Sequence, residues 1–290
     1  MRQYLQSTQS ELYFIWLYSL QKIAMVNLSS LHLMLTTRFP GLETLLFELL
    51  PTTSGFLKQE SLDTGKPYFC LANEQTEGYG QRGQRWLSSA DSLTFTLGLP
   101  FSLPIHKLSL LSLGVAMSLH QSISGYFSEQ VKLKWPNDLL LNGAKLSGIL
   151  IESVQVKQDS CYLLIGIGIN GSALETLGTE NELPYAHLEM SALSDEVLCS
   201  FICDLVAGLL QLPTQMSEDR EAFQANSLAF MKKHDYFQTH SKVIVYHSGS
   251  NEQGHYLGLD SEGRVLVEIG GVIKRFSSGM VSLRPLRVYE

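Results

Sequence analysis

The chain has 290 residues, of which 44% are hydrophobic and 17% charged, a composition that excludes disorder and predicts one large globular domain with room for a smaller one. Its formal net charge of −7 argues against a nucleic-acid partner, which needs a basic protein face. The irregularly spaced cysteines predict buried thiols in a reducing cytoplasm, and neither a disulfide framework nor a zinc site; they are Cys70, Cys161, Cys199 and Cys203.

Residues 1–44 are expected to form an N-terminal extension with helical character. Its apolar run from Leu12 to Leu20 is too short for a membrane span, which needs roughly 20 residues. A signal peptide is disfavoured, because Arg2 is the only basic residue before the run and no small-x-small cleavage site follows it. A short amphipathic helix, or an extension upstream of a true start at Met25 or Met34, remains open.

The first motif follows a short predicted helix and a predicted strand. Thr52-Thr53-Ser54 suits the start of a helix over 51–59, and residues 68–72 are typical of a strand. The next segment, Gly78-x-Gly80-x-x-Gly83, has the spacing of a dinucleotide fingerprint. That fingerprint requires a helix after the third glycine, whereas residues 92–99 alternate with period two and predict a strand. The glycine pattern therefore does not indicate a Rossmann unit.

The middle of the chain predicts a sheet with covering helices. A helix is expected over 108–123, and Asn142-Gly143 suits a tight hairpin turn with positive φ angles. Further strands are expected at 131–134, 145–152 and 161–169. Further helices are expected from the cap at Ser194 to about residue 210 and over roughly 217–233.

From residue 242 the pattern changes to short strands separated by turns, at 243–246, 255–259, 264–269 and 272–276. This pattern predicts a small antiparallel barrel. The pattern therefore predicts an α+β fold class, a mixed sheet with covering helices plus a small C-terminal β-barrel. We expect a catalytic domain over 45–238 and the barrel over 239–290.

Several polar motifs fall at strand ends. The glycines near Gly78 can aim backbone N–H groups at an anion, and the neighbouring arginines can bind phosphate, although a plain surface hairpin is equally compatible. In Lys134-Trp135-Pro136-Asn137-Asp138 the carboxylate of Asp138 could hold Mg²⁺ and the amide of Asn137 could reach a nucleotide; the alternative is a turn with a packed tryptophan. Gly166 and Gly168 remove side chains from one face of a strand, where a flat ligand could lie.

Together these motifs resemble the biotin–protein ligases. The resemblance rests on the glycine-loop segment beginning at Glu74-Gln75-Thr76, on Lys134 to Asp138, on Lys145-Leu146-Ser147-Gly148-Ile149-Leu150 and on Gly166-Ile167-Gly168-Ile169-Asn170. It spans roughly residues 45–285 and fits the form without an N-terminal DNA-binding domain. It implies a class II aminoacyl-tRNA synthetase-like catalytic fold and an SH3-like C-terminal β-barrel. It also implies an enzyme that joins biotin and ATP, with Mg²⁺, into biotinyl-5′-adenylate and then transfers biotin to a lysine of a carboxylase carrier domain, such as that of acetyl-CoA carboxylase.

The resemblance implies two sets of site residues around Lys145, the expected catalytic cation, which would lower the repulsion between the biotin carboxylate and the α-phosphate. The biotin side is expected to comprise Thr52, Thr53, Ser54, Gln75, Gly78, Tyr79, Gly80, Gln81, Lys145, Gly148, Gly166 and Gly168. The nucleotide side is expected to comprise Arg82, Gln84, Arg85, Trp86, Lys134, Asn137, Asp138 and Asn170, with Asp138 as the magnesium ligand.

The chain also departs from the family pattern. Tyr79 and Gln81 stand where arginines are common, which leaves Arg82 and Arg85 as the cations of the loop. We therefore hypothesise that the loop closes less firmly over the adenylate and that the intermediate escapes more readily. The usual Ser-Thr-Asn is replaced by Thr52-Thr53-Ser54, which retains hydroxyls but loses an amide and bears on biotin affinity.

Three alternatives to a biotin ligase are weighed. An operator-binding repressor is disfavoured, because only about 45 residues precede the ligase-like region, without a polar-faced recognition helix. A lipoate or octanoate ligase would share the sheet but lack the motif from Lys134 to Asp138. A non-catalytic biotin-binding relic would explain the altered arginines, yet Lys145 and Asp138 are both present. Pairing of a sheet edge with the carrier domain, or with a second copy in a homodimer, stays open.

Overall fold

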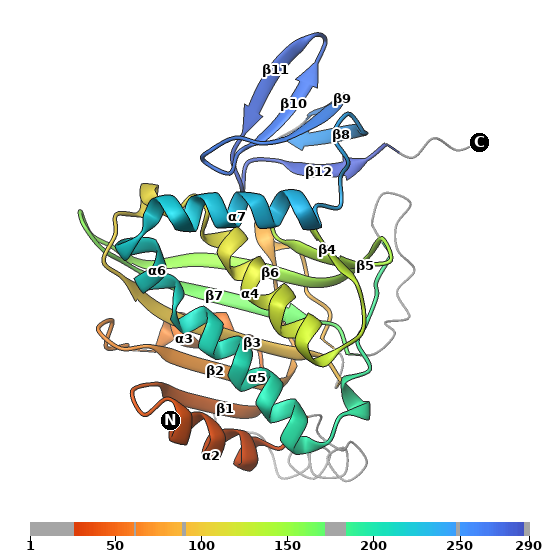
Figure 1. The fold of residues 1–290 in the computed structure, drawn as a ribbon. Helices are drawn as coiled ribbons and strands as arrows, with labels where there is room; N and C mark the ends of the chain where they lie inside the picture. Colours follow the sequence, from red (N-terminus) through yellow and green to blue (C-terminus); the bar gives the residue numbers. More distant parts are fainter. Residues whose placement is uncertain (1–25, 61, 89–90, 172–183, 248–249, 287–290) are drawn as a thin grey trace.

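The structure is a computed structural model that describes residues 26–60, 62–88, 91–171, 184–247 and 250–286. A seven-stranded mixed sheet carries helices on one face, and a five-stranded antiparallel sheet follows it (Figure 1). The α+β class expected from the sequence is confirmed. The apolar run from Leu12 to Leu20 lies outside the described residues.

The large sheet has the strand order β1-β2-β3-β7-β6-β5-β4. Only the pair β1 and β2 is parallel, and the remaining neighbours are antiparallel. The strands are β1 (Glu43–Leu50), β2 (Tyr68–Gln75), β3 (Leu93–Phe101), β4 (Val131–Lys134), β5 (Asp138–Leu141), β6 (Ala144–Val156) and β7 (Cys161–Ile169). The strand β1 is additional to those predicted from the sequence, and β5 and β6 meet at the predicted turn, where Asn142 has φ 51° and Gly143 φ 79°.

The helices pack mainly on one face of this sheet (Figure 1). They are α2 (Leu28–Arg38), α4 (Leu111–Tyr126), α5 (Asp195–Leu210), α6 (Leu212–Glu218) and α7 (Arg220–His234), while α3 (Thr53–Gln59) packs on the opposite face against β2, β3 and β7. Two single-turn 3₁₀ helices are η2 (Ile105–Lys107) and η3 (Met190–Ala192). Ser194 caps α5 as predicted, because its hydroxyl accepts from Val197 N at 3.4 Å.

Two predicted helices differ from the observed ones. The helix expected over 108–123 begins and ends three residues later, because Leu108 and Leu110 close tight turns before α4 starts. The helix expected over roughly 217–233 is α7, which begins at Arg220, and the preceding α6 ends at Glu218. Asp219 separates them, since its carboxylate accepts from Ala222 N at 2.9 Å and so starts α7 afresh.

The stretch Asp195–Glu218, which contains α5 and α6, is long and apolar enough to cross a membrane by composition alone. The core helix of a globular domain passes the same test, and α5 fits that description. Its buried residues include both Cys199 and Cys203, which lie in the main hydrophobic core. The four cysteines are all buried free thiols, as predicted.

The strand β7 explains where a ligand site can form. Its odd-numbered residues from Cys161 to Ile169 are buried in the main core beneath the helices. On the other face, two side chains join the small cluster that includes Leu57 of α3, and glycines follow. Along that face the residues are, in order, Tyr162, Leu164, Gly166 and Gly168. The sheet is therefore covered by α3 at one end of this face and bare at the other.

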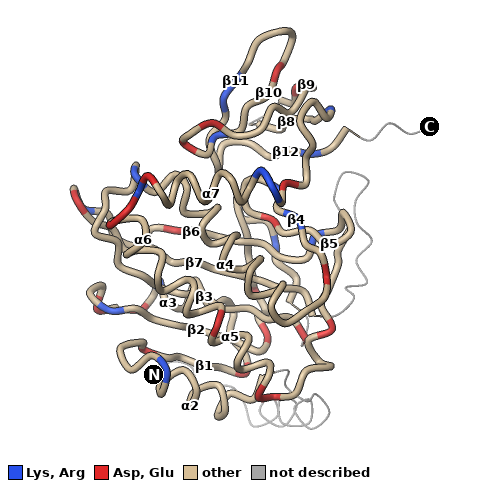
Figure 2. Tube along the Cα trace, viewed as in Figure 1, with Lys and Arg blue, Asp and Glu red and all other residues tan. Residues whose placement is uncertain are grey.

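The second sheet has the order β11-β10-β9-β8-β12. Its strands are β8 (Lys242–His247), β9 (Ser250–Leu259), β10 (Val265–Ile269), β11 (Val272–Phe276) and β12 (Ser282–Pro285), the last of which is additional to those predicted. Trp135 joins the two sheets, because its indole N–H donates to Gly263 O at 3.0 Å. Basic and acidic residues are interspersed over both parts of the described chain (Figure 2).

Candidate active site

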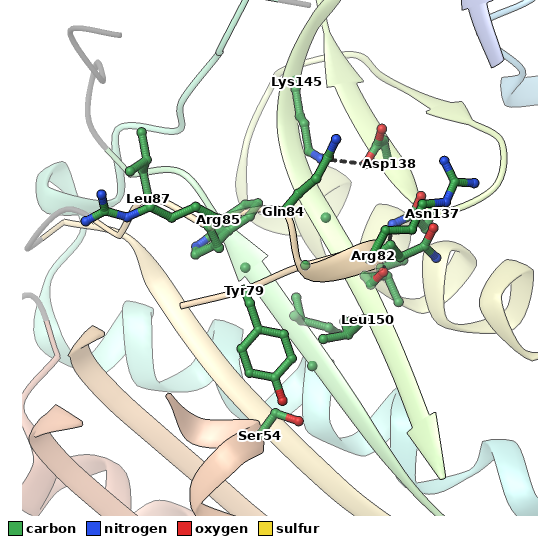
Figure 3. Close-up of a pocket in the computed structure, with 18 of the residues that line it drawn as sticks. Ser54, Tyr79, Arg82, Gln84, Arg85, Leu87, Asn137, Asp138, Lys145 and Leu150 are labelled. Carbon is green, nitrogen blue, oxygen red and sulfur yellow. Dashed lines mark hydrogen bonds and ion pairs between the residues drawn. The ribbon is translucent and has the colours of Figure 1, made fainter. Parts of the chain in front are cut away.

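A pocket of about 510 Å³ lies over the bare end of the large sheet. Its walls come from α3, from the loop between β2 and β3, from β4 to β7 and from the second sheet (Figure 3). All the residues expected at the two sides of the site line it except Gly78, whose carbonyl accepts from Trp86 N at 2.9 Å. The structure thus brings all the predicted site residues but one together around a single pocket.

One end of the pocket is built from hydroxyl and amide groups. Gln75 Oε1 accepts from Thr53 N at 2.7 Å and from Thr53 Oγ1 at 3.2 Å. The same hydroxyl lies 2.8 Å from that of Thr96 on β3. Thr52 is the N-cap of α3 but its side chain makes no capping bond; the amide of Gln75 satisfies the first turn instead. This end of the pocket is polar, hydrogen-bonded and fixed.

The segment Gly78–Trp86, which we call the glycine loop, forms a small hairpin at the pocket rim. Gly80 N donates to Gln84 O at 2.7 Å, and residues Gln81–Gly83 form the single 3₁₀ turn η1 at the tip. Arg82 and Gly83 have φ angles of 59° and 70°, so the tip uses the left-handed region that an arginine rarely adopts. Arg82 also donates to Gly279 O at 3.3 Å, which ties the tip to the second sheet.

Trp86 covers part of the glycine-lined floor. A Cβ built on Gly168 would overlap the indole, and one on Gly148 would lie 3.2 Å from it. A Cβ on Gly166 would have no neighbour closer than 3.6 Å. The expectation that both β7 glycines receive a flat ligand therefore needs correction in this structure, because the indole lies on Gly168 and only Gly166 faces the pocket without a covering side chain.

Asp138 holds two lysines at the pocket wall. Its carboxylate lies 2.8 Å from Lys145 Nζ and 3.2 Å from Lys134 Nζ, and Figure 3 shows Lys145 directed at Asp138. Burial would raise the pKa of Asp138, but the charges of Lys145 and Lys134 hold that pKa below its ordinary value. The lysine side chains are 27% and 6% exposed, respectively, so Lys145 is the one that a ligand reaches.

This arrangement does not fit the predicted magnesium ligand. Both oxygens of Asp138 already face ammonium groups, and a cation would have to displace one of them. Among the described residues there is also no group of three or more His, Cys, Asp or Glu side chains that could hold a metal. Asp138 is therefore better described as the group that positions Lys145.

Two asparagines fix the backbone around the pocket. Asn170, 1% exposed, donates to Lys145 O and Ala186 O at 3.0 Å each. Its buried side-chain oxygen has no hydrogen-bond partner among the described residues, and the residue belongs to the pocket lining. Asn137 donates to Ile149 O at 2.9 Å, so one N–H of its amide supports the turn and the second N–H is left for a ligand.

Sequence reasoning missed several lining residues. Thr96, Tyr185, Tyr246 and Arg284 line the pocket, and Glu152 binds two of the predicted residues from just outside it. Tyr246 and Arg284 belong to the second sheet, where the guanidinium carbon lies 4.7 Å from the ring centroid. Only the docking of the two sheets brings them to the pocket, and no local motif signals that docking.

Residues 46–170 match the sequence model of the biotin/lipoate A/B protein ligase family. This region resembles that family, and it makes up less than half of the chain. Among curated relatives, the bifunctional ligase/repressor BirA of Bacillus spizizenii is 34% identical over 76 residues, and the biotin–[acetyl-CoA-carboxylase] ligase of Paracoccus denitrificans is 36% identical over 79 residues. These alignments cover 26% and 27% of this chain and only 23% and 33% of the relatives.

Solved structures agree with the fold over a longer range. The biotin protein ligase of Aquifex aeolicus, in complex with biotin and ATP, aligns with a TM-score of 0.65 over 84% of this chain and 99% of that one, at 22% identity. The biotin protein ligase of Leishmania major, in complex with biotin, aligns with a TM-score of 0.55 over 82% and 99%, also at 22% identity. At these identities the likeness establishes the shared fold alone, which includes the α+β arrangement described above.

Proposed function

We propose that the protein is an ATP-dependent biotin–protein ligase, which forms biotinyl-5′-adenylate and then transfers biotin to a lysine of a carboxylase carrier domain. The observation that carries this proposal is the position of Lys145. Asp138 fixes its ammonium group at the wall of a pocket whose other end is lined by hydroxyl and amide groups. A ligand with a polar head and a carboxylate tail fits between those two features.

The polar end of the pocket favours biotin over lipoate. A buried ureido ring needs hydrogen-bond partners for its carbonyl and its N–H groups, and Thr53, Gln75 and Thr96 offer such groups within one network. The dithiolane ring of lipoate has no polar N–H or C=O group to satisfy them, so binding it would leave this network without ligand partners. This preference separates the two branches of the biotin/lipoate family.

The residues of the chain suit the first chemical step. An oxygen of the biotin carboxylate attacks the α-phosphorus of ATP, and the bond to the pyrophosphate oxygen breaks. Both reactants are anionic, so a fixed ammonium group at Lys145 reduces their repulsion and stabilises charge in the transition state. The exposed Arg85 supplies a cation for the nucleotide at the rim, and Asn170 lines the same pocket.

The second step transfers the acyl group. The neutral acceptor lysine amine attacks the biotinyl carbonyl carbon, an amide forms as the nitrogen loses a proton to solvent, and AMP leaves with the electron pair of the anhydride bond. We propose a carboxylase carrier domain as the partner and the cytoplasm as the location, in keeping with the buried free thiols. Assembly as a homodimer is a further expectation, because both ends of the large sheet, β1 and β4, are edge strands.

The test is pyrophosphate release by the full chain with ATP, magnesium and either biotin or lipoate. We expect biotin-dependent release that falls by about 100-fold or more in Lys145→Ala. Lys66→Ala is the matched control, because Lys66 forms an exposed ion pair with Glu43 away from the pocket lining. Pyrophosphate release with lipoate alone would assign the protein to the lipoate branch. No release with either compound would indicate a non-catalytic biotin-binding protein.

A further inference from the structure

The glycine loop is joined to the body of the domain by a side-chain cluster that contains no arginine. Tyr79, near the start of the loop, donates its hydroxyl to Glu152 Oε2 on β6 at 3.2 Å. Lys58 of α3 donates to the Tyr79 hydroxyl at 3.1 Å and to Glu152 Oε1 at 2.6 Å. Ser54, also on α3, donates to Glu152 Oε2 at 2.6 Å. In Figure 3 the ring of Tyr79 points away from Lys145 and toward Ser54.

We propose that Tyr79 is a latch, which holds the glycine loop against the pocket rim before any ligand binds. The hydroxyl of Tyr79 both donates and accepts, so its hydrogen-bonding capacity is used within the protein. Glu152 is the common acceptor for a residue of the loop and two residues of α3. The loop, α3 and β6 are thereby connected through one carboxylate.

The charges of the cluster strengthen the latch. Lys58 and Glu152 form an ion pair whose side chains are 38% and 22% exposed, so solvent screens it only partly. Burial would lower the pKa of Lys58, but the hydrogen bonds to Glu152 and Tyr79 outweigh that effect and raise its pKa. Lys58 therefore stays ionised near neutral pH, and hydrogen bonds to charged groups are stronger than those between neutral groups.

The rest of the loop agrees with a closed state. Backbone bonds close the hairpin between Gly80 and Gln84 and between Gly78 and Trp86, and Arg82 reaches Gly279 O at the tip. The indole of Trp86 lies on the floor at Gly148 and Gly168. Contacts within the protein thus hold the start, the tip and the end of the loop.

With this latch, the free energy that orders the glycine loop comes from contacts within the protein and not from contacts with the ligand. An arginine at position 79 could gain its interactions from ligand phosphate, and loop closure would then depend on the ligand. The tyrosine gains its interactions from Glu152 and Lys58, so closure is largely complete beforehand. The inference rests on the proposed function only for the identity of the ligand, because the ligand-free state of the loop can be measured by itself.

The test uses limited trypsin digestion of the full chain without ligands. Arg82 and Arg85 are exposed within the loop, and cleavage after them requires the loop to detach and extend, so its rate follows the open population. We expect slow cleavage in the wild type and cleavage about tenfold faster in Tyr79→Phe, since a net hydrogen-bond contribution of this kind corresponds to roughly that factor. Biotin with ATP should restore slow cleavage in the variant and change the wild type little.

Tyr68→Phe is the matched control, because it also removes one tyrosine hydroxyl, which accepts from Asp63 N at 3.1 Å away from the loop. It should leave loop cleavage unchanged. Equal cleavage rates of the wild type and Tyr79→Phe without ligands would overturn the latch, as would equal acceleration by the Tyr68→Phe control. If Tyr79→Phe opens the loop but biotin and ATP neither protect it nor release pyrophosphate, the latch stands and the proposed function fails.

Discussion

Lys145 Nζ lies 2.8 Å from Asp138 Oδ1, and Lys134 Nζ lies 3.2 Å from the other oxygen of the same carboxylate. Asp138 faces Gly148 across the β5–β6 pair, and Gly148 lies three residues after Lys145 on the return strand. The hairpin at Asn142 therefore fixes the distance between carboxylate and cation. The carboxylate neutralises one lysine that is almost buried and aims another at the pocket.

Asp138→Asn should reduce both activity and stability, although Lys145 remains. Without the carboxylate, Lys145 loses its fixed position, and we expect biotin-dependent pyrophosphate release to fall by roughly 10- to 100-fold. Lys134 would remain only 6% exposed without its counter-charge, so the free energy of unfolding in urea should fall by roughly 3 kcal/mol.

The control for this change is Asp204→Asn, which alters an ion pair with Arg38 whose side chains are 43% and 45% exposed. It should cost less than about 1 kcal/mol of stability and leave pyrophosphate release unchanged. Wild-type activity in Asp138→Asn would show that Lys145 needs no positioning partner.

The features that could be predicted from the sequence are those that depend on residues close together in the chain. The strand over residues 161–169 and the turn at Asn142 were predicted at their observed positions, because an unbroken apolar run and an Asn-Gly pair each favour one backbone conformation. Lys134, Asn137 and Asp138 were placed at the site through the resemblance of their motif to a known family, and all three line the pocket. Features that depend on distant partners were not predicted. The short strand β12 forms only by pairing with β8.

The missed site residues have the same explanation. Thr96 lies 43 positions from Thr53, and Glu152 lies 98 positions from Ser54. Neither residue stands in an unusual local pattern, and each gains its role from a neighbour across the sheet. The predicted magnesium ligand failed similarly, since Asp138 looks available until the second lysine is placed beside it.

Gly168→Ala should displace Trp86, whereas Gly166→Ala should not. A methyl group at Gly168 would overlap the indole, while one at Gly166 would meet nothing within 3.6 Å. We expect the tryptophan emission of Gly168→Ala to shift to longer wavelength and its adenylate formation to fall. Gly166→Ala should keep the wild-type emission but raise the KM for biotin, because its methyl group enters the pocket. A shift of equal size in both variants would mean that the indole does not lie on Gly168.

Asp235 should make stability depend on pH in the opposite direction from an ordinary ion-paired carboxylate. It follows α7 and accepts from Tyr256, and burial raises its pKa to about 6 despite that hydrogen bond. Between pH 4 and 6 the folded chain binds a proton that the unfolded chain releases, so the contribution of Asp235 to stability decreases as pH rises through this window. Above pH 6 it stays constant.

Asp235→Asn removes this titration and retains an acceptor for Tyr256. The stability of the variant relative to wild type should rise by roughly 1–3 kcal/mol from pH 4 to pH 6, measured by urea unfolding. Asp204 is the control, because its contribution to stability has the opposite dependence on pH. The hydrogen bond from Tyr126 and the charge of Arg38 lower its pKa, so its contribution is present above pH 4 and lost as the pH falls. Parallel curves for wild type and Asp235→Asn would refute the raised pKa.

Gln81→Arg should slow the release of the adenylate. Gln81 lies at the tip of the glycine loop and lines the pocket, and its side chain is neutral. An added guanidinium at that point could bind the phosphate of the intermediate in two hydrogen bonds, and a gain of about 1.4 kcal/mol corresponds to a tenfold slower release. The release of labelled adenylate from preloaded enzyme measures this rate. Gln84→Arg, on the same loop, tests whether a positive charge at another loop position slows release equally.

The latch and this effect can be separated in the same assay. Tyr79 holds the start of the loop through Glu152, whereas Gln81 would act directly on the ligand. Gln81→Arg should therefore slow release in both the wild-type and the Tyr79→Phe background by similar factors, because the two sites do not share a partner. An unchanged release rate in Gln81→Arg would mean that the latch alone already retains the intermediate, and that the loss of the arginine at this position carries no kinetic consequence.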